Sequence, residues 1–435
     1  MRKFAIFFVA LLVLAVSAAE VRPKYLFLLI GDGMGPNVVK FYRNQMKATS
    51  FDKLGEPIPT GTNNVFGKTT DSAASGSALA CGNKTYNGSM AMDKNKRPMT
   101  SLAKILKKRG MKIGIISSVA INDATPGTHY VNRNSRHDAA GSFADLKASN
   151  FDFFGVSSFK KPGNMHTKDM VAELKNSGFN VQQGANGLAA LKQGGKNIFY
   201  GSTRFGGKPS LAAVTEKAIE LLDNPKGFFM MVEGGAIDGG NHCNSVRDMM
   251  QEMIAFDEMI ASVLKFAEKH PAETLVVVTA DHDTGGIMID GKVPVGFWKK
   301  QTSGYGSMDS TAKKMLKAKA SKAEIVAYVC KTVGIANLTA EEQKRVDAAA
   351  DRFMAGKKTE KGSMYGKYNP LVIEVMRVRD ARNNFHYTTF SHTPVKVKTF
   401  VVGNGKQLFV EPQENSDIPR RMSVAATGED LLEKR

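Results

Sequence analysis

Cysteine is scarce in this sequence of 435 residues, which holds only Cys81, Cys243 and Cys330. Three scattered thiols cannot build a disulfide framework, and their odd number leaves at least one of them free. We therefore expect a fold that does not depend on disulfides. The remaining composition, 42% hydrophobic and 23% charged residues, is that of an ordinary globular protein with a large core.

Long apolar runs are also missing, since no segment approaches the roughly 20 apolar residues of a membrane-spanning helix. The longest run, Phe4–Val16, follows Arg2 and Lys3 and precedes small residues at positions 17–19. A basic start, an apolar centre and a small-residue cleavage site are typical of a signal peptide. We expect residues 1–19 to be removed, and the mature chain, without a membrane span, to be periplasmic or secreted.

Acidic residues are fewer than basic ones, 41 against 60, which gives a formal net charge of +19. Such a charge attracts anions, including nucleic acids, acidic membranes and phosphorylated metabolites. The lysines, however, are spread along the whole chain, without a basic block interleaved with aromatic residues and without zinc-finger spacing. We expect no specific nucleic-acid partner and assign most of these charges to a solvated surface.

Several short apolar runs end at a small or polar residue and are typical of buried parallel strands: Tyr25–Ile30, Ile113–Ile116, Phe228–Val232 and Leu275–Thr279. Helical patterns lie between them, at Met99–Arg109, Leu211–Leu222 and Val246–Glu268. The alternation predicts an α/β fold with a doubly wound, mostly parallel central sheet flanked by helices. Ligands bind such sheets beyond the carboxyl ends of the strands, where Asp32, Glu233 and Asp281 lie.

The regular alternation stops after Asp290, and residues 304–384 are rich in lysine and helical in pattern. Candidate helices there are Ser310–Val333, Thr339–Met354 and Asn369–Arg382, before a strand resumes at Val395–Val402. We expect a helical insertion, a cap or crown, between two parts of one catalytic domain. The predicted parts of that domain are residues 20–303 and 385–435.

The stretch TTDSAASGSALACGNKTYNG, residues 69–88, has hardly a side chain large enough to build a core. One interpretation is a close-packed helix whose N-cap is Asp71 or Ser72. The other is that Ser72 is a nucleophile at the start of a helix, where unpaired N–H groups favour an anion. The stretch alone favours the first interpretation.

Polar residues at the predicted strand ends include the ligand types that zinc prefers, imidazole nitrogen and carboxylate oxygen. Two sets can be drawn, Asp238, His242 and His392 for one ion, and Asp32, Asp281 and His282 with the Ser72 oxygen for another. Two metals about 3.5–4 Å apart stabilise the attacking and leaving oxygens of an in-line displacement, as in phosphatases. The sequence thus points to metal-assisted transfer chemistry.

Each of these motifs also has a purely structural interpretation. GDGMG, which contains Asp32, fits a strand-to-loop turn, and Asp281-His282 fits a hydrogen-bonded strand end. The two glycines between Asp238 and His242 argue against a ligand pair one helical turn apart, so DGGNH fits a surface turn. Four segments with complementary ligand types nevertheless end at one edge of the predicted sheet, and that coincidence favours a functional site.

These motifs resemble those of the alkaline phosphatases. TTDSAASGSALACGNKTYNG, VEGGAIDGGNH, TADHDTGG and GDGMG, together with NDATPGTHYVNR and SHTP, occur in the family's order over nearly the whole mature chain. The resemblance implies hydrolysis of small phosphate monoesters to an alcohol and inorganic phosphate. It implies that Ser72 is the nucleophile that forms a phosphoserine intermediate and that Arg133 binds two phosphate oxygens.

The resemblance also implies two Zn²⁺ ions and one Mg²⁺ ion. By resemblance, Asp238, His242 and His392 bind the first zinc and Asp32, Asp281 and His282 bind the second, while Thr125, Glu233 and a bridging Asp32 hold the magnesium, with Asp123 behind it. Cobalt or manganese fits the same donors. A homodimer is compatible with the resemblance, which leaves the oligomeric state open.

Two departures from the family pattern are visible. The family usually has Lys, His or Trp after the first-zinc aspartate, where this chain has Gly239, so a side chain that tunes phosphate or metal binding is missing. The stretch between His282 and His392 is longer than in the simplest bacterial members. We expect the insertion to narrow the choice of substrate.

Two kinds of alternative function remain. Some are other enzymes built on a similar sheet, and the others are binding proteins that the basic charge alone would explain. A sulfatase needs Cys or Ser in a C/S-x-P-x-R context, whereas Ser72 is followed by Ala-Ala-Ser, and diesterases of this superfamily usually use Thr without an arginine like Arg133. A phosphate- or nucleic-acid-binding protein without turnover does not need an intact Ser72 and a full ligand set. Release of p-nitrophenol from the monoester, the diester and the sulfate separates these functions.

Overall fold

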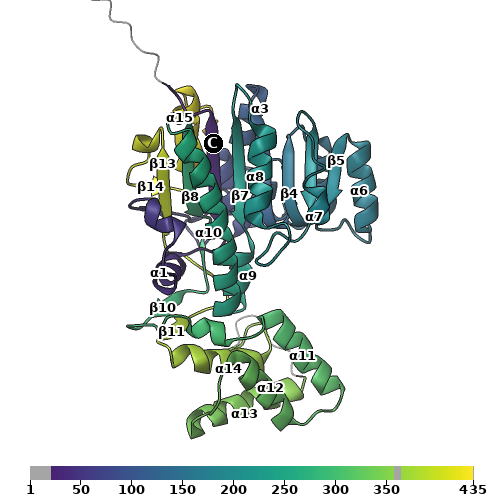
Figure 1. Cartoon of the computed structure of the whole chain (residues 1–435), viewed down its shortest axis with the longest axis vertical. Coiled ribbons are helices and arrows are strands. Elements are labelled where there is room, and N and C mark those ends of the chain that lie inside the picture. Colours follow the sequence, from purple (N-terminus) through teal and green to yellow (C-terminus); the bar gives the residue numbers. More distant parts are fainter. Residues whose placement is uncertain (1–20, 357–363, 435) are drawn as a thin grey trace, which may run out of the picture.

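The computed structural model describes residues 21–356 and 364–434, so the predicted signal peptide lies outside the described residues. Its centre is a ten-stranded sheet in the order β14-β2-β13-β8-β1-β7-β3-β4-β6-β5 (Figure 1). The strands are β1 (Tyr25–Gly31), β2 (Ile58–Gly61), β3 (Lys112–Ala120), β4 (Phe153–Ser158), β5 (Phe179–Gln183), β6 (Lys196–Tyr200), β7 (Phe228–Gly234), β8 (Thr274–Ala280), β13 (Val397–Gly403) and β14 (Gln413–Glu414).

Neighbouring strands of the sheet are parallel, except that β13 runs antiparallel to β8 and β2. The central strands β1, β7 and β8 are buried along their whole length. Strands buried on both faces read as continuous apolar runs, which is why the sequence marks them so clearly. The predicted α/β fold with a mostly parallel sheet is confirmed.

Helices cover both faces of the sheet, so each strand contributes alternate side chains to two cores. In β1, Tyr25, Phe27 and Leu29 pack into one core, and Leu26, Leu28 and Ile30 into the other. The first core takes α1 (Pro36–Gln45), α8 (Leu211–Leu222) and α10 (Val246–Lys269). The second takes α2 (Ser72–Cys81), α3 (Leu102–Lys108), α4 (Ala124–Gly127), α5 (Ala139–Ala148), α6 (Thr167–Asn176) and α15 (Asp417–Thr427).

Four helices between β10 (Ile287–Ile289) and β11 (Phe385–Tyr387) gather at one end of the molecule, below the sheet in Figure 1. They are α11 (Tyr305–Lys317), α12 (Lys322–Val333), α13 (Ala340–Met354) and α14 (Pro370–Ala381). These helices share a hydrophobic cluster of their own, and β10 pairs with β11 in antiparallel fashion where the chain leaves and returns. We call α11 to α14 the helical insertion.

The single helix expected over Ser310–Val333 is wrong, because the chain breaks there into α11 and α12. Lys319 has a φ of 60°, a left-handed conformation that interrupts a helix. Ser321 then begins α12 with a capping box, in which its side chain and that of Glu324 each bind the other's backbone N–H. The sequence analysis did not consider this cap, although Ser321 followed by Glu324 three residues later fits the pattern of a capping box.

Two further expectations concern what the chain lacks. The three cysteines are free thiols, as their number indicated. Within residues 21–356 and 364–434, no helix combines the length and apolar character needed to cross a bilayer.

Candidate metal centre

Neighbouring strands place most of the candidate residues at one edge of the sheet. Asp281 and His282 follow β8, Asp32 follows β1, and Glu233 is the last residue but one of β7. The registers set Gly31 beside both Gly234 and Ala280, so these strands end side by side. The carboxyl edge of the sheet therefore brings together residues that are up to 250 positions apart, as the strand pattern predicted.

Asp32, Asp281 and His282 form a buried cluster whose ligand atoms lie within 4.8 Å of one another. His282 Nε2 lies 3.1 Å from Asp281 Oδ2 and 3.6 Å from Asp32 Oδ1. The other oxygen of Asp281 accepts hydrogen bonds from the backbone N–H groups of Gly33 and His282. These bonds fix the Asp281 carboxylate with Oδ2 directed at the cluster. The hydroxyl of Ser72 completes it, with Oγ 3.2 Å from His282 Nε2.

A second cluster, of Asp238, His242 and His392, adjoins the first. His242 Nε2 lies 3.1 Å from Asp238 Oδ2 and 3.2 Å from His392 Nε2. The rings of His392 and His282 stack with their centroids 3.5 Å apart. His392 reaches this place because β12 (His392–Thr393) pairs with β9 (Asp283–Thr284), which follows His282 in the chain. The two predicted ligand sets are therefore continuous.

Asp238 and His242 lie one turn apart on the helix α9 (Ala236–His242). The expectation that the two intervening glycines exclude a helical ligand pair is therefore wrong. A Cβ at Gly240 would lie 2.5 Å from the backbone nitrogen of Met249 in α10, so only glycine allows this close helix contact. Tertiary packing thus outweighs the low helix propensity of glycine.

Hydrogen bonds orient the imidazole rings. His242 Nδ1 lies 2.6 Å from the carbonyl oxygen of Phe390, and His392 Nδ1 lies 2.9 Å from the carbonyl oxygen of Thr70. Because a carbonyl only accepts, each Nδ1 donates, and each Nε2 is directed into the cluster with a free lone pair. Burial also lowers the pKa of His282 and His392. For His242, burial has the same effect, but the hydrogen bond and the charge of Asp238 outweigh it and raise the pKa, so a cation at Asp238 would have to displace that proton. Neutral imidazoles with Nε2 directed inward are the form that binds metals.

Glu233 and Thr125 form the third part of the site with Asp32. Glu233 Oε2 accepts a hydrogen bond from Ser117 on the neighbouring strand β3. Burial raises the pKa of Glu233 to about 8, although neighbouring side chains, including Ser117, oppose the rise. Burial and then the charge of Asp281 likewise raise the pKa of Asp32 well above its ordinary range. Carboxylates crowded in this way require a positive partner to stay ionised.

Four oxygen atoms of the site are buried without a hydrogen-bond partner among the described residues: Asp32 Oδ1, Thr125 Oγ1, Glu233 Oε1 and Asp281 Oδ2. Buried polar atoms left unpaired are costly, and each such group in a native structure has a reason. Bound cations would satisfy all four. The mixed imidazole and carboxylate donors suit zinc, and the oxygen donors of Asp32, Thr125 and Glu233 suit magnesium.

Ser72 is the first residue of α2, a helix in which all ten residues are buried. Asp71 is the N-cap, and its Oδ1 accepts a hydrogen bond from the backbone N–H of Ala74. The close-packed helix and a serine at its start are thus both present, because the small residues bury the helix while Ser72 at its N-terminus contacts His282 of the first cluster. The helix N-terminus favours an anion beside Ser72.

Arg133 does not lie at this site. Two backbone hydrogen bonds with Met90 hold the residue in an isolated bridge, and its guanidinium pairs with Asp145 at 2.8 Å and with Asp138 at 3.3 Å. Its Nη atoms also donate to the carbonyl oxygens of Asn132 and Gly141. The side chain is thereby committed to the start of α5, and the structure does not bring it together with the two clusters, so its role in phosphate binding stays a prediction.

Arg136 takes the place expected for Arg133. Its Nη1 lies 3.2 Å from Asp71 Oδ2, next to Ser72, and its Nη2 lies 3.3 Å from Asp123 Oδ1. Asp123 also accepts a hydrogen bond of 2.6 Å from Lys160 Nζ. Burial opposes ionisation of Asp123, but Lys160 and then Arg136 hold its pKa below the ordinary value. The sequence analysis did not consider Arg136, which lies three residues after Arg133, and no local sequence signal distinguishes the two arginines.

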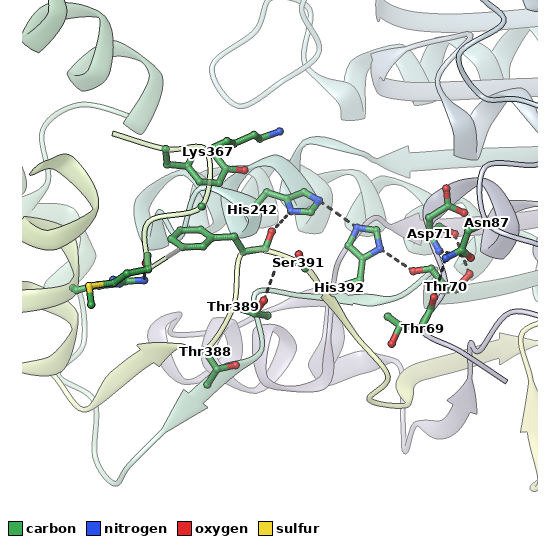
Figure 2. A pocket seen from close by; sticks show the side chains of 15 residues that line it. Thr69, Thr70, Asp71, Asn87, His242, Lys367, Thr388, Thr389, Ser391 and His392 are labelled. Atoms are coloured by element: carbon green, nitrogen blue, oxygen red, sulfur yellow. Dashed lines mark hydrogen bonds between the residues drawn. The ribbon is translucent and has the colours of Figure 1, made fainter. Parts of the chain in front are cut away.

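A cavity of about 950 Å³ opens from His242 and His392 toward the helical insertion. Figure 2 shows these two histidines between Lys367 on one side and Asp71 and Asn87 on the other. The cavity wall thus combines the loop before α2, the segment around His392 and the insertion. Gly239, in contrast, has open space around its Cα, since an added Cβ would meet nothing within 4 Å.

Comparisons with known proteins agree on one family. The family described as alkaline phosphatase matches residues 23–153 and 173–428. Alkaline phosphatase 4 of Bacillus subtilis is 31% identical over 428 residues, covering 92% of this chain and 87% of the relative. Alkaline phosphatase 3 of the same organism is 28% identical, with 92% and 88% covered.

Solved structures agree with the sequence relatives. A cold-active alkaline phosphatase from a psychrophilic Shewanella species has a TM-score of 0.76 at 28% identity. The match covers 92% of this chain and 99% of the other. The likeness therefore includes the sheet, its flanking helices and most of the remaining chain.

Proposed function

The chain belongs to the alkaline phosphatase family, a family of metal-dependent phosphatases, and on that basis we propose that it hydrolyses phosphate monoesters through a phosphoserine intermediate on Ser72. We propose two zinc ions and one magnesium ion as its cofactors. The observation that carries the proposal is the position of Ser72 Oγ, 3.2 Å from His282 Nε2 in a cluster of inward-facing donors. A hydroxyl at that place can attack a phosphate bound at the clusters.

We assign the ligands as the resemblance implies. Asp238, His242 and His392 would hold the first zinc, Asp32, Asp281 and His282 the second, and Asp32, Thr125 and Glu233 the magnesium. Cations in these positions supply charge that lowers the pKa of a coordinated hydroxyl or water and stabilises the leaving oxygen.

The chemistry proceeds in two displacements at phosphorus. Ser72 Oγ loses its proton and forms a bond to phosphorus as the bond to the ester oxygen breaks, and the alcohol leaves with a proton. Water then attacks the phosphoserine, and inorganic phosphate leaves as Ser72 Oγ regains a proton. The N-terminus of α2 stabilises the negative phosphoryl group in both steps.

Arg136 is our candidate for the residue that binds two phosphate oxygens. Its bonds to Asp71 and Asp123 use two of the five N–H donors of a guanidinium. The planar fork that remains matches two phosphate oxygens better than a lysine ammonium does. Asp123 and Lys160 act behind it by holding the guanidinium in place.

The decisive experiment compares three p-nitrophenyl substrates, the phosphate monoester, the bis-ester and the sulfate, with metal-loaded and chelator-treated protein. We expect metal-dependent turnover of the monoester, far above the other two. With ³²P-labelled monoester at acidic pH, label should remain on the wild-type protein and not on Ser72→Ala. Preference for the diester or sulfate, or label on the Ala variant, would refute the proposal.

We also propose that the chain is exported to the periplasm or secreted, on the strength of the signal-like pattern in residues 1–19. Expression with and without these residues, followed by fractionation, tests the proposal. Export that does not depend on them would contradict it.

A further inference from the structure

The cavity beside the two clusters lies where the alcohol part of a substrate must go. The contacts run in one order from Ser72 Oγ to His282, from His282 to the stacked ring of His392, and from His392 to His242. In an in-line displacement the leaving oxygen is opposite the nucleophile, and so on the side of His392 and His242. The cavity of about 950 Å³ begins at these two residues, so its wall contacts the leaving group.

An unpaired cation lies in that wall. Lys367, an exposed residue shortly before α14, lines the cavity together with His242 and His392. Among the described residues no carboxylate pairs with Lys367, and Asp71, the carboxylate in the cavity wall, already accepts hydrogen bonds from Arg136, Gly88 and Ala74.

An aromatic pair adjoins this lysine. The rings of Tyr368 and Phe390 lie 5.1 Å apart, and Lys367 Nζ is 5.7 Å from the Tyr368 ring. Tyr305 packs edge-on against Tyr368 at 5.4 Å, and the carbonyl of Phe390 accepts the hydrogen bond from His242. The pair is therefore held in place at the end of the cavity that adjoins the candidate metal ligands. The Arg377 guanidinium lies 5.4 Å from the centre of the Phe390 ring. Both aromatic residues line the cavity, so they give it an apolar wall against which a planar group can pack.

Resting on the proposed function, we propose that this site prefers phosphate monoesters whose leaving group is aromatic and carries a second anionic group, with the ring against Tyr368 and Phe390 and the anion bound by Lys367. The helical insertion thereby determines the substrate class. The phosphate-binding residues do not contribute to this preference, because they come from the other side of the clusters.

Two substrates that differ only in the second anionic group of the leaving group test the role of its charge. In 4-carboxyphenyl phosphate and 4-carbamoylphenyl phosphate, the leaving groups have nearly the same shape, and only the first carries the second anion. The measured quantity is the ratio of their kcat/KM values in wild type, in Lys367→Gln and in Lys331→Gln, a control that removes an exposed lysine of α12 outside the cavity wall. Comparing ratios between proteins cancels the difference in intrinsic leaving-group reactivity.

We expect Lys367→Gln to lower the carboxy-to-carbamoyl ratio by about threefold to fivefold, as for a partly exposed ion pair, and Lys331→Gln to leave it unchanged. The wild-type ratio should also fall in 1 M salt. An equal ratio in all three proteins would overturn the role of Lys367.

The aromatic part has its own measurement. Tyr368→Leu should reduce kcat/KM for phenyl phosphate relative to glycerol phosphate by about threefold to tenfold, because it removes a stacking partner but keeps an apolar side chain. An unchanged aryl-to-alkyl ratio would overturn the stacking. If wild type hydrolyses none of these monoesters, the proposed function itself fails, whereas turnover with unchanged ratios refutes only the substrate class.

Discussion

Replacing the two neighbouring arginines one at a time tests the site most directly. Arg136→Ala removes the guanidinium beside Asp71 and Asp123, whereas Arg133→Ala removes one that pairs with Asp138 and Asp145 away from the clusters. Each charge-assisted hydrogen bond is worth about 1.5–3 kcal/mol. Loss of two bonds to phosphate therefore predicts a fall in kcat/KM of about 10²-fold to 10⁴-fold for Arg136→Ala. The fall should be near the smaller value if water takes the place of the guanidinium and binds the phosphate oxygens.

Arg133→Ala should behave as a stability variant. It loses two ion pairs and two hydrogen bonds to carbonyl groups at a side chain that is 29% exposed, which predicts a loss of about 1–2 kcal/mol in the free energy of unfolding. Its kcat/KM should stay within about twofold of wild type. The assays are steady-state kinetics with p-nitrophenyl phosphate, the inhibition constant of inorganic phosphate, and urea unfolding.

The reverse pattern would refute this assignment. If Arg133→Ala lost activity and phosphate inhibition by 10²-fold while Arg136→Ala kept both, the guanidinium of Arg133 would have to reach the clusters in the working enzyme. Arg136→Lys is an intermediate variant, because lysine keeps the positive charge but lacks the planar pair of N–H donors of a guanidinium. Its kcat/KM should lie between those of Arg136→Ala and wild type.

Four other predictions follow from the same geometry. Ser72→Ala should retain phosphate inhibition but lose most turnover, measured as kcat, and full turnover would exclude Ser72 as nucleophile. Chelation should abolish activity, and zinc plus magnesium should restore it more fully than either ion alone. Lys160→Met should weaken phosphate inhibition severalfold, because Asp123 then holds Arg136 less firmly; an unchanged constant would mean that Arg136 is fixed without it. Gly239→Lys has room for its side chain and should tighten phosphate inhibition by on the order of 1 kcal/mol, whereas a weaker constant would show that position 239 faces away from phosphate.

Strand-end ligands were predictable because parallel strands in register deliver the residues that follow them to one edge. Asp32, Asp281 and His282 needed no more than the recognition of β1 and β8. His392 arrives through a different route, a two-residue strand pairing with β9, which is too short to be visible as a pattern. The sequence analysis included His392 in the first ligand set by its residue type and then by the family motif, without predicting this pairing.

Other features of the site could not be predicted because they depend on contacts between segments that are distant in the sequence. The two glycines between the predicted ligands Asp238 and His242 argued against a helix there, yet Gly240 is needed in that helix because the backbone of Met249 approaches it closely. Arg133 and Arg136 differ in nothing that local sequence reveals. Backbone pairing with Met90 fixes the direction of the first, and the hydrogen bond from the Arg136 N–H to the carbonyl of Gly88 draws the second toward Asp71.

Because β10 pairs with β11 in antiparallel fashion, the two ends of the helical insertion join the sheet domain side by side. A chain built in this way can exchange or lose the segment in a single recombination event without altering the register of any strand in the large sheet. If this segment contacts the alcohol as we propose, it can vary while the strands that carry the proposed metal ligands keep their positions. Relatives in which the segment between β10 and β11 is shorter should catalyse the same reaction and differ in the esters that they prefer.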